Sequence, residues 1–122
     1  MMTGQVVAHH ALVHVPLRMP HQPEMEVGFV VDTGFTGSLT LPPAMVTALN
    51  LPFLRRIPAN LADGSTIFLS VYSATIVWDG APRDVEVLAT TGRQPLLGTL
   101  LLDGYKLTVA FEDGGTVTID PL

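Results

Sequence analysis

Glycine and proline divide this chain into short segments, and most of those segments have the composition of β-strands. The 122 residues include 11 glycines and 10 prolines. Between these residues lie runs rich in β-branched and apolar side chains, at 6–17, 25–31, 38–42, 66–78 and 83–90. Short runs of this kind, bounded by turn residues, are typical of strands. The pattern predicts an all-β fold, either a barrel or a sandwich, in a single domain over residues 1–122.

Turn residues also mark two hairpins and two short helices. The sequences ADGS at 62–65 and DGG at 113–115 each separate two apolar stretches, as hairpin turns do. A proline pair introduces a helix at 43–50, and Asn50 is a suitable residue at which that helix ends. A second short helix is expected within 99–105, where a glycine ends it. Both helices are brief, so the fold remains mostly β.

Composition argues against several classes of function. The net charge is −5 and no basic cluster is present, which disfavours a nucleic-acid partner. The chain has no cysteine, so it has no disulfide framework, thiolate nucleophile or thiolate metal site. Its longest apolar runs are far shorter than the roughly 20 residues needed to cross a bilayer, and no signal-peptide pattern opens it. We expect a cytoplasmic protein that needs no cofactor, no metal and no membrane.

The chain is nevertheless unusually apolar for a protein with a fully solvated surface. Hydrophobic residues make up 48% of it and charged residues 14%, and its mean hydropathy is +0.42. Large exposed apolar areas usually belong to interfaces or binding grooves. Part of this apolar surface is therefore expected in a subunit interface or a binding cleft.

Asp32, in the sequence VVDTGFTGS (30–38), is the residue that most requires an explanation. Two β-branched apolar residues precede it, so a buried strand leads directly to an ionisable carboxylate. Burying such a group is costly unless it is paired or used, and no basic residue lies nearby in sequence. An aspartate at this place either caps a turn by accepting backbone N–H groups two residues on or takes part in catalysis. Asp-Thr-Gly alone is weak support for catalysis, because composition produces it in roughly one chain of this length in forty.

The surroundings of Asp32 strengthen the catalytic hypothesis. VVDTG is followed by the ADGS hairpin and then by PLLG at 95–98. In this order the three features resemble those of retropepsin-like aspartic proteases, of a bacterial rather than a viral type, over about residues 24–111. The resemblance implies a closed β-barrel with one or two short helices, a substrate-covering flap and a turn that supports the site. The implied flap residues are Ala62, Asp63, Gly64 and Ser65, and the implied supporting residues are Leu96, Leu97 and Gly98.

The activity that this resemblance implies is hydrolysis of peptide bonds by two carboxylates. Two adjacent carboxylates share one proton, so one acts as base toward water while the other acts as acid toward the substrate. The chain has one Asp-Thr-Gly, and a symmetric homodimer would supply the second Asp32. The resemblance assigns the water-activating carboxylate to Asp32, a hydroxyl that bonds across the dimer to Thr33, and a close-approach glycine to Gly34. The partners expected are a second copy of the chain and a peptide or protein substrate.

Some positions match the family and others depart from it. Ser38 matches a serine or threonine usual at that offset. Phe35 stands where pepsin-like enzymes have a hydroxyl residue and retropepsins mostly have alanine. Thr36 and Thr99 stand where viral members have a paired Asp and Arg, so both partners are missing together. We therefore expect other contacts to brace the dimer. Four apolar residues are candidates to line the substrate pockets: Val30, Leu39, Ile67 and Leu97.

Other readings of the chain remain open. His9, His10 and His14 invite a metal hypothesis, but on a strand His10 and His14 would share one face with His9 opposite, and no acidic or thiol ligand accompanies them. Neither GFTGS nor DGS continues into a phosphate-binding loop, and no nucleophile-elbow motif is present. The alternative to a protease is a catalytically inactive barrel that binds peptides or other proteins through the same cleft, because fold does not determine function.

Overall fold

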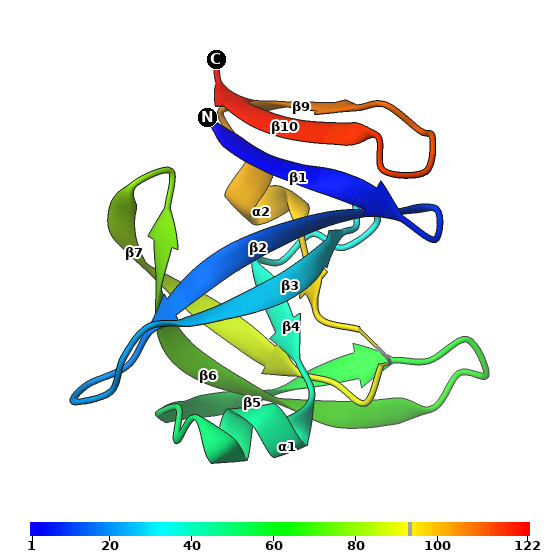
Figure 1. Cartoon of the computed structure of the whole chain (residues 1–122). Coiled ribbons are helices and arrows are strands. Elements are labelled where there is room, and N and C mark those ends of the chain that lie inside the picture. Colours follow the sequence, from blue (N-terminus) through cyan, green and yellow to red (C-terminus); the bar gives the residue numbers. More distant parts are fainter. Residues whose placement is uncertain (93) are drawn as a thin grey trace.

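The computed structural model describes residues 1–92 and 94–122 (Figure 1). In this part of the chain ten strands form one sheet and two short helices flank it. The helices are α1 (Pro43–Ala48) and α2 (Thr99–Leu102). The strands are β1 (Met2–Val7), β2 (His10–Arg18), β3 (Met25–Val31), β4 (Leu39–Leu41), β5 (Phe53–Asn60), β6 (Thr66–Trp78), β7 (Ala81–Ala89), β8 (Leu96–Leu97), β9 (Tyr105–Val109) and β10 (Thr116–Pro121). No helix among the described residues is long and apolar enough to span a bilayer.

Six of the strands form a closed ring. The sheet order is β5-β6-β7-β4-β8-β3-β2-β1-β10-β9, and β2 also pairs with β6. This additional pairing joins Leu17 to Ile76 and Arg18 to Thr75 in antiparallel register, so the ring runs β6-β7-β4-β8-β3-β2. β5 lies outside the ring beside β6, and β1, β10 and β9 extend the sheet beyond β2 (Figure 1).

Alternation along the strands places the core on one face of the sheet. In β2 the side chains of Ala11, Val13, Val15 and Leu17 are buried, while those between them are partly or fully exposed. This period of two follows from the pleat of a strand. Phe29 of β3 is completely buried in the same cluster. Full burial of such side chains contributes about 1.5–3 kcal/mol each, so the alternation is a strong determinant of register.

The prediction of a mostly β fold with two short helices is confirmed. The strand expected at 66–78 has those bounds. The helix expected at 43–50 ends at Ala48, and Asn50 follows in the left-handed region with φ 52°. Gly104, also left-handed with φ 83°, follows α2. Asparagine and glycine tolerate this backbone region better than other residues do, which explains why they end the two helices.

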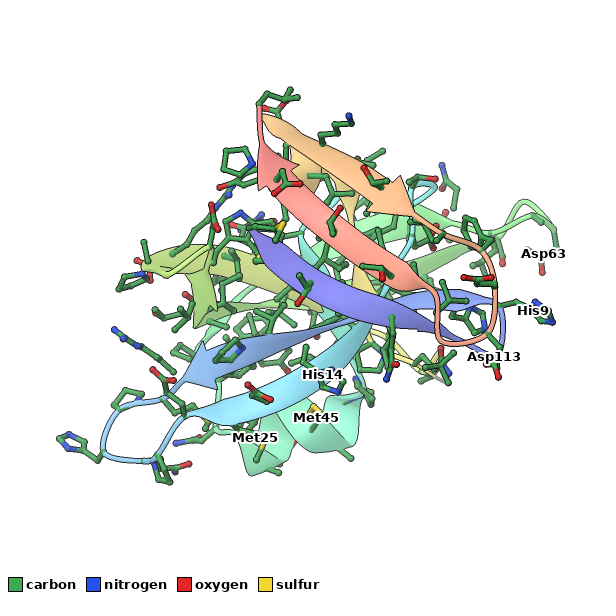
Figure 2. The ribbon with its side chains drawn as sticks, turned by 45° about the horizontal axis from the view of Figure 1, so that its top comes forward. His9, His14, Met25, Met45, Asp63 and Asp113 are labelled. Atoms are coloured by element: carbon green, nitrogen blue, oxygen red, sulfur yellow. The ribbon has the colours of Figure 1, made fainter. Side chains whose placement is uncertain are left out.

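The N-terminal histidines lie differently from the arrangement expected for one strand. The chain reverses at Ala8 and His9, whose φ angles are 49° and 67°, so His9 lies in a turn while His10 and His14 lie on β2. Figure 2 shows His9 at the tip of this turn beside the loop of Asp113, well away from His14. Two-residue hairpins with both φ angles positive usually contain Asn or Gly, and Ala-His does not carry that signal. The expectation that His9 faces away from the other two on the same strand is therefore wrong.

β5 was not predicted from the sequence, because its residues carry only a weak strand pattern. It contains two arginines and Pro58, and it lies at the edge of the sheet, paired only with β6 among the described strands. Proline is acceptable in an edge strand because one side of that strand has no ladder to complete. Most of the β5 side chains are exposed, so the alternation that marks an inner strand is missing from its sequence.

Candidate active site

Asp32 follows directly on β3, at a point where the ring holds its backbone. Val30 and Val31 pair in parallel with Leu96 and Leu97 of β8, and the Asp32 N–H donates a hydrogen bond to the Leu97 carbonyl oxygen at 2.9 Å. The Asp32 side chain is partly exposed, although the strand before it is largely buried. The carboxylate therefore leaves the core at the end of the strand, which avoids the cost of full burial.

The Asp32 carboxylate also orders the turn that follows. Its Oδ1 accepts a hydrogen bond from the Gly34 N–H at 2.8 Å, and the Phe35 N–H donates to the Asp32 carbonyl oxygen at 3.1 Å. A Cβ on Gly34 would lie 3.2 Å from Oδ1, so glycine allows this close approach. Among the described residues Oδ2 has no hydrogen-bond partner, and Thr33 and Gly34 are exposed beside it. Asp32 thus caps a turn and still presents one free carboxylate oxygen.

The segment after Asp32 is joined to the segment around Gly98 by a set of backbone hydrogen bonds. Gly98, Thr99 and Leu100 donate their N–H groups to the carbonyl oxygens of Ser38, Phe35 and Gly37, at 2.8, 2.8 and 3.2 Å respectively. In β8 the Leu96 N–H donates to the Thr40 hydroxyl oxygen at 2.9 Å. Parts of the chain more than 50 residues apart in sequence therefore form one rigid support for the Asp32 turn.

Gly98 is required at the centre of this support. A Cβ at position 98 would lie 2.6 Å from the Phe35 carbonyl oxygen and closer still to that of Gly37. Both neighbours are backbone atoms held by hydrogen bonds, so neither can move aside cheaply. The φ angle of Gly98 is −102°, which any residue adopts. The requirement for glycine is therefore one of space and not of backbone conformation.

The loop at 61–65 connects β5 and β6 into a long hairpin. The Leu61 N–H donates to the Ser65 carbonyl oxygen at 2.8 Å, and Gly64 is left-handed with φ 84°. Asp63 Oδ1 accepts the Ser65 hydroxyl at 2.6 Å and the Ser65 N–H at 2.9 Å. These two hydrogen bonds, the hydroxyl first, lower the pKa of the Asp63 carboxyl. Ala62 and its neighbours in this loop are exposed, and Figure 2 shows Asp63 at the outer end of the hairpin.

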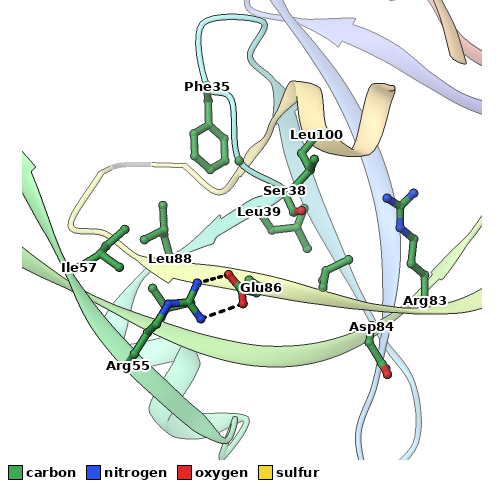
Figure 3. A pocket seen from close by; sticks show the side chains of 13 residues that line it. Phe35, Ser38, Leu39, Arg55, Ile57, Arg83, Asp84, Glu86, Leu88 and Leu100 are labelled. Atoms are coloured by element: carbon green, nitrogen blue, oxygen red, sulfur yellow. Dashed lines mark hydrogen bonds and ion pairs between the residues drawn. The ribbon is translucent and has the colours of Figure 1, made fainter. Parts of the chain in front are cut away.

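Two cavities adjoin the Asp32 turn, and Phe35 borders both of them. The first, of about 400 Å³, lies between residues 35–39 and strands β5 to β7 (Figure 3). The second, of about 710 Å³, lies between Phe35 and the β5–β6 hairpin, with Leu61 and Ile67 in its lining. Of the four residues predicted to line substrate pockets, Ile67 is exposed and borders the second cavity. Leu39 borders the first cavity but is fully buried, and Val30 and Leu97 are buried as well.

Three solved protease structures share this arrangement of strands. EIAV protease in complex with the inhibitor HBY-793 matches with a TM-score of 0.59 and 16% identity, over 80% of this chain and 88% of that one. A retropepsin-like aspartic protease from Rickettsia conorii gives a TM-score of 0.59 and 14% identity, over 95% of this chain and 88% of that one. The chain has a retropepsin-like fold. This confirms the resemblance read from the sequence as far as the fold is concerned.

The third structure contains more than a protease. The foamy viral protease–reverse transcriptase in complex with an RNA/DNA hybrid matches with a TM-score of 0.53 and 18% identity, over 78% of this chain but only 12% of that one. No protein-family model and no curated protein sequence matches the chain. At identities this low, the likeness concerns the fold alone, and the chemistry has to be argued from the residues of this chain.

Within the retropepsin-like fold, Phe35 is the residue whose role was least evident from the sequence. A Cβ on Gly37 would lie 2.6 Å from the Phe35 ring and one on Gly98 would lie 2.7 Å from it, so the ring packs over both glycines. Phe35 also lines both cavities. In the sequence, Gly37 and Gly98 are the residues that could have indicated this packing, because glycines leave space for a neighbouring ring.

The structure brings some of the predicted site residues together and leaves others apart. Asp32 and the β8 segment are joined by hydrogen bonds, as described above. Among the described residues the predicted flap, Ala62–Ser65, makes no hydrogen bond to either segment and lines neither cavity, although the adjacent Leu61 lines the second one. Thr99 donates its N–H to Phe35, and its hydroxyl oxygen lies 3.4 Å from the same carbonyl oxygen. Thr40, which accepts the Leu96 N–H, was not recognised in the sequence, because a threonine in an apolar strand has no distinctive pattern.

Proposed function

We propose that this chain is an aspartic endopeptidase whose active site is formed by Asp32 from each of two copies. The observation that carries the proposal is the position of Asp32: it ends a buried strand, its backbone is bonded to Leu97, and one of its carboxylate oxygens is free. A retropepsin-like fold around that carboxylate supports the same conclusion. Residues 1–122 are proposed to act as a single catalytic domain.

The proposed mechanism needs two carboxylates that share one proton. The ionised carboxylate takes a proton from a water molecule as the water oxygen attacks the peptide carbonyl carbon, and the protonated carboxyl gives its proton to the carbonyl oxygen. Transfer of a proton to the amide nitrogen then lets the C–N bond break. Because the chain has one Asp-Thr-Gly, the second carboxylate is proposed to come from a homodimer. Thr33 and Gly34 are exposed next to Asp32, which leaves them accessible to the second copy.

Substrate is proposed to bind as an extended peptide between the Asp32 turn and the β5–β6 hairpin. The second cavity lies in this place, and Phe35, Ile67 and Leu96 are among the apolar residues that line it. The loop Ala62–Ser65 would act as the flap that covers the peptide, because lids that close over substrates are drawn from exposed loops of this kind. Leu96, Leu97 and Gly98 would support the site from below.

The test of catalysis is a digest of a peptide library by the wild-type chain and by Asp32→Asn. Asparagine has nearly the same shape as aspartate and cannot act as a base, so the variant is expected to fold and to lose all cleavage. Asp113→Asn, an exposed change in the β9–β10 loop, is the matched control and is expected to cleave at the wild-type rate. An Asp32→Asn protein that cleaves as fast as the wild type would contradict the assignment.

The test of the shared site is a mixing experiment. Equal amounts of wild-type and Asp32→Asn chains are dissociated together and allowed to reassociate at random. If both copies of Asp32 are required, about a quarter of the activity of the same total amount of wild type remains. A value of about one half would place the whole active site within one chain. Sedimentation of the same samples shows whether dimers are present.

A second candidate function is a peptide-binding module without catalysis. Phe35 supports this alternative, because its apolar ring packs over Gly37 and Gly98 and lines both cavities, which gives bound peptides an apolar contact. In that case the wild type would bind peptides without cleaving any of them, and Asp32→Asn would bind them equally well. Cleavage that depends on Asp32 excludes this candidate.

A further inference from the structure

The first cavity lies along an edge of β7. Four consecutive residues of this strand line the cavity: Arg83, Asp84, Val85 and Glu86. Successive side chains of a strand point to opposite faces, so a cavity on one face would be lined by every second residue only. The lining by all four shows that the cavity meets the edge of the strand, where backbone N–H and C=O groups lie.

From Ala81 to Glu86 this edge has no neighbouring strand among the described residues. β6 pairs with β7 on one side from Ala81 to Leu88, whereas β4 pairs on the other side only from Val87 to Ala89. The Thr90 N–H donates to Leu41, on the β4 side. Because backbone groups alternate along a strand, those of Asp84 and Glu86 point to the same side, into the cavity. Unpaired strand edges of this kind bind extended peptides by adding them as a further strand.

Of the two arginines that line the cavity, one is paired with a carboxylate and the other has no such partner among residues 1–92 and 94–122. Arg55 donates two hydrogen bonds to Glu86, one of them at 2.8 Å. These bonds lower the pKa of Glu86 and raise that of Arg55, so the pair stays ionised and has no net charge. Asp84 accepts the hydroxyl of Thr75 at 2.7 Å, and its carboxylate points away from the Arg83 guanidinium (Figure 3).

Arg83 is the cation of the cavity that forms no ion pair among the described residues. It is half-buried. The chain has only six Lys and Arg residues against eleven Asp and Glu, and two of the six line this one cavity. Asp84 and Glu86 balance these two charges formally, but Arg83 itself has no ion-pair partner among the described residues and is available to a carboxylate from outside the chain.

We propose that the first cavity binds an extended, acidic segment of the peptide substrate. The segment pairs with the β7 edge at Asp84 and Glu86, and a Glu or Asp side chain of the segment meets the Arg83 guanidinium. An apolar side chain next to it packs against Leu100, an exposed residue that lines the same cavity. This inference rests on the proposed endopeptidase function, and it makes Arg83 a residue that determines specificity. Charge-assisted hydrogen bonds to a guanidinium are among the stronger polar contacts.

The test measures binding to the Asp32→Asn chain, so that cleavage does not interfere. The probes are capped peptides of about seven residues, roughly one strand in length, with alternating Val and Thr and a single Glu placed at each position in turn. A second set has Gln in place of Glu. At one position at least, the Glu peptide is expected to bind about tenfold more tightly than its Gln counterpart. Backbone amide signals of Asp84 and Glu86 are expected to shift most in NMR spectra.

Variants of Arg83 separate this site from general attraction between charges. Arg83→Gln is expected to reduce the Glu preference to about onefold, and Arg83→Lys, which keeps the charge, is expected to retain part of it. Lys106→Gln removes an exposed cation on β9 that does not line the cavity and is the matched control. NMR spectra of each variant verify that it is folded.

Failure of this inference is distinguishable from failure of the proposed function. Equal binding of Glu and Gln peptides at every position, a preference that survives in Arg83→Gln, or no binding of any probe would overturn the acidic site. None of these results depends on hydrolysis. Loss of cleavage in Asp32→Asn combined with equal Glu and Gln binding would keep the endopeptidase and reject the site.

Discussion

Substitution of Gly98 by alanine tests whether the crossing of two distant segments supports the Asp32 turn. The added Cβ would overlap the carbonyl oxygens of Gly37 and Phe35, the latter at 2.6 Å, where ordinary contacts begin near 3.4 Å. Relief of this overlap moves the two segments apart. Three backbone hydrogen bonds join them at that point, and each contributes about 0.5–1.5 kcal/mol to stability. Their loss or weakening is expected to lower the free energy of unfolding by about 3 kcal/mol.

The matched control for this change is Gly92→Ala. A Cβ on Gly92 would meet nothing among the described atoms closer than the Thr90 hydroxyl oxygen at 3.9 Å. Alanine restricts the unfolded chain in both variants, and this effect alone adds a similar amount, about 0.4–1 kcal/mol, to the free energy of unfolding of each. The difference between the two variants therefore isolates the overlap in the folded state.

The assay is urea unfolding of both variants at one fixed protomer concentration, because dimerisation would make stability depend on concentration. With a slope of about 1–3 kcal/mol per molar urea for a small protein, a difference of 3 kcal/mol separates the midpoints by about 1–3 M. Gly98→Ala is also expected to lose peptide hydrolysis in the absence of urea, because Asp32 is bonded to the neighbouring Leu97. Midpoints for the two variants that agree within about 0.3 M would refute the argument.

Three further predictions concern the support of the site, the hairpin loop and the reaction. Thr40→Val leaves the part-buried Leu96 N–H without its acceptor and is expected to destabilise the fold by about 1–3 kcal/mol in urea unfolding, whereas Thr40→Ser, which keeps the acceptor, costs less. The hydrogen bonds from Ser65 lower the pKa of the Asp63 carboxyl below its usual value of 3.8. These bonds therefore stabilise the folded loop at pH 3.8 and above, and they are lost as the pH falls through the lowered pKa of Asp63. The Ser65 amide signal in NMR spectra should therefore titrate below pH 3.8, and a midpoint at or above 3.8 would contradict this. Peptide hydrolysis is expected to show a bell-shaped pH dependence, because the active pair of carboxylates carries one proton, and a plateau above neutrality would argue against the pair.

Local patterns determined most of the strands and both helices. The runs at 25–31 and 66–78 became β3 and β6 with those bounds, because alternating or β-branched residues between turn residues carry their own structural preference. Asn50 and Gly104 ended the helices as expected. The turn at Ala8 and His9 was missed, because its positive φ angles are imposed by the pairing of β1 with β2 and not by the residue types.

The candidate site was predictable as a list of residues but not as a surface. Asp32 could be identified because a carboxylate at the end of an apolar strand requires an explanation, whereas Gly34 and Gly98 followed from the resemblance to retropepsin-like proteases. The Arg55–Glu86 pair and the unpaired edge of β7 could not, because neither residue has a pattern of its own and their approach depends on how β5, β6 and β7 align. In the sequence Phe35 stood out only because it departs from the retropepsin-like pattern. That it lines two cavities became evident only from the folded chain.

The sequence by itself determined where the chain forms strands, where it turns and which carboxylate emerges from a buried strand. These features depend on interactions between residues close in sequence: the pleat of a strand, the backbone freedom of glycine and the desolvation of one charge. Only the tertiary structure decided that residues 35–38 are hydrogen-bonded to residues 98–100, that six strands close into a ring, and that Arg83 lacks a carboxylate partner among the described residues. Each of these depends on contacts between residues far apart in sequence, and such contacts arise from the packing of the whole chain, which no single segment encodes.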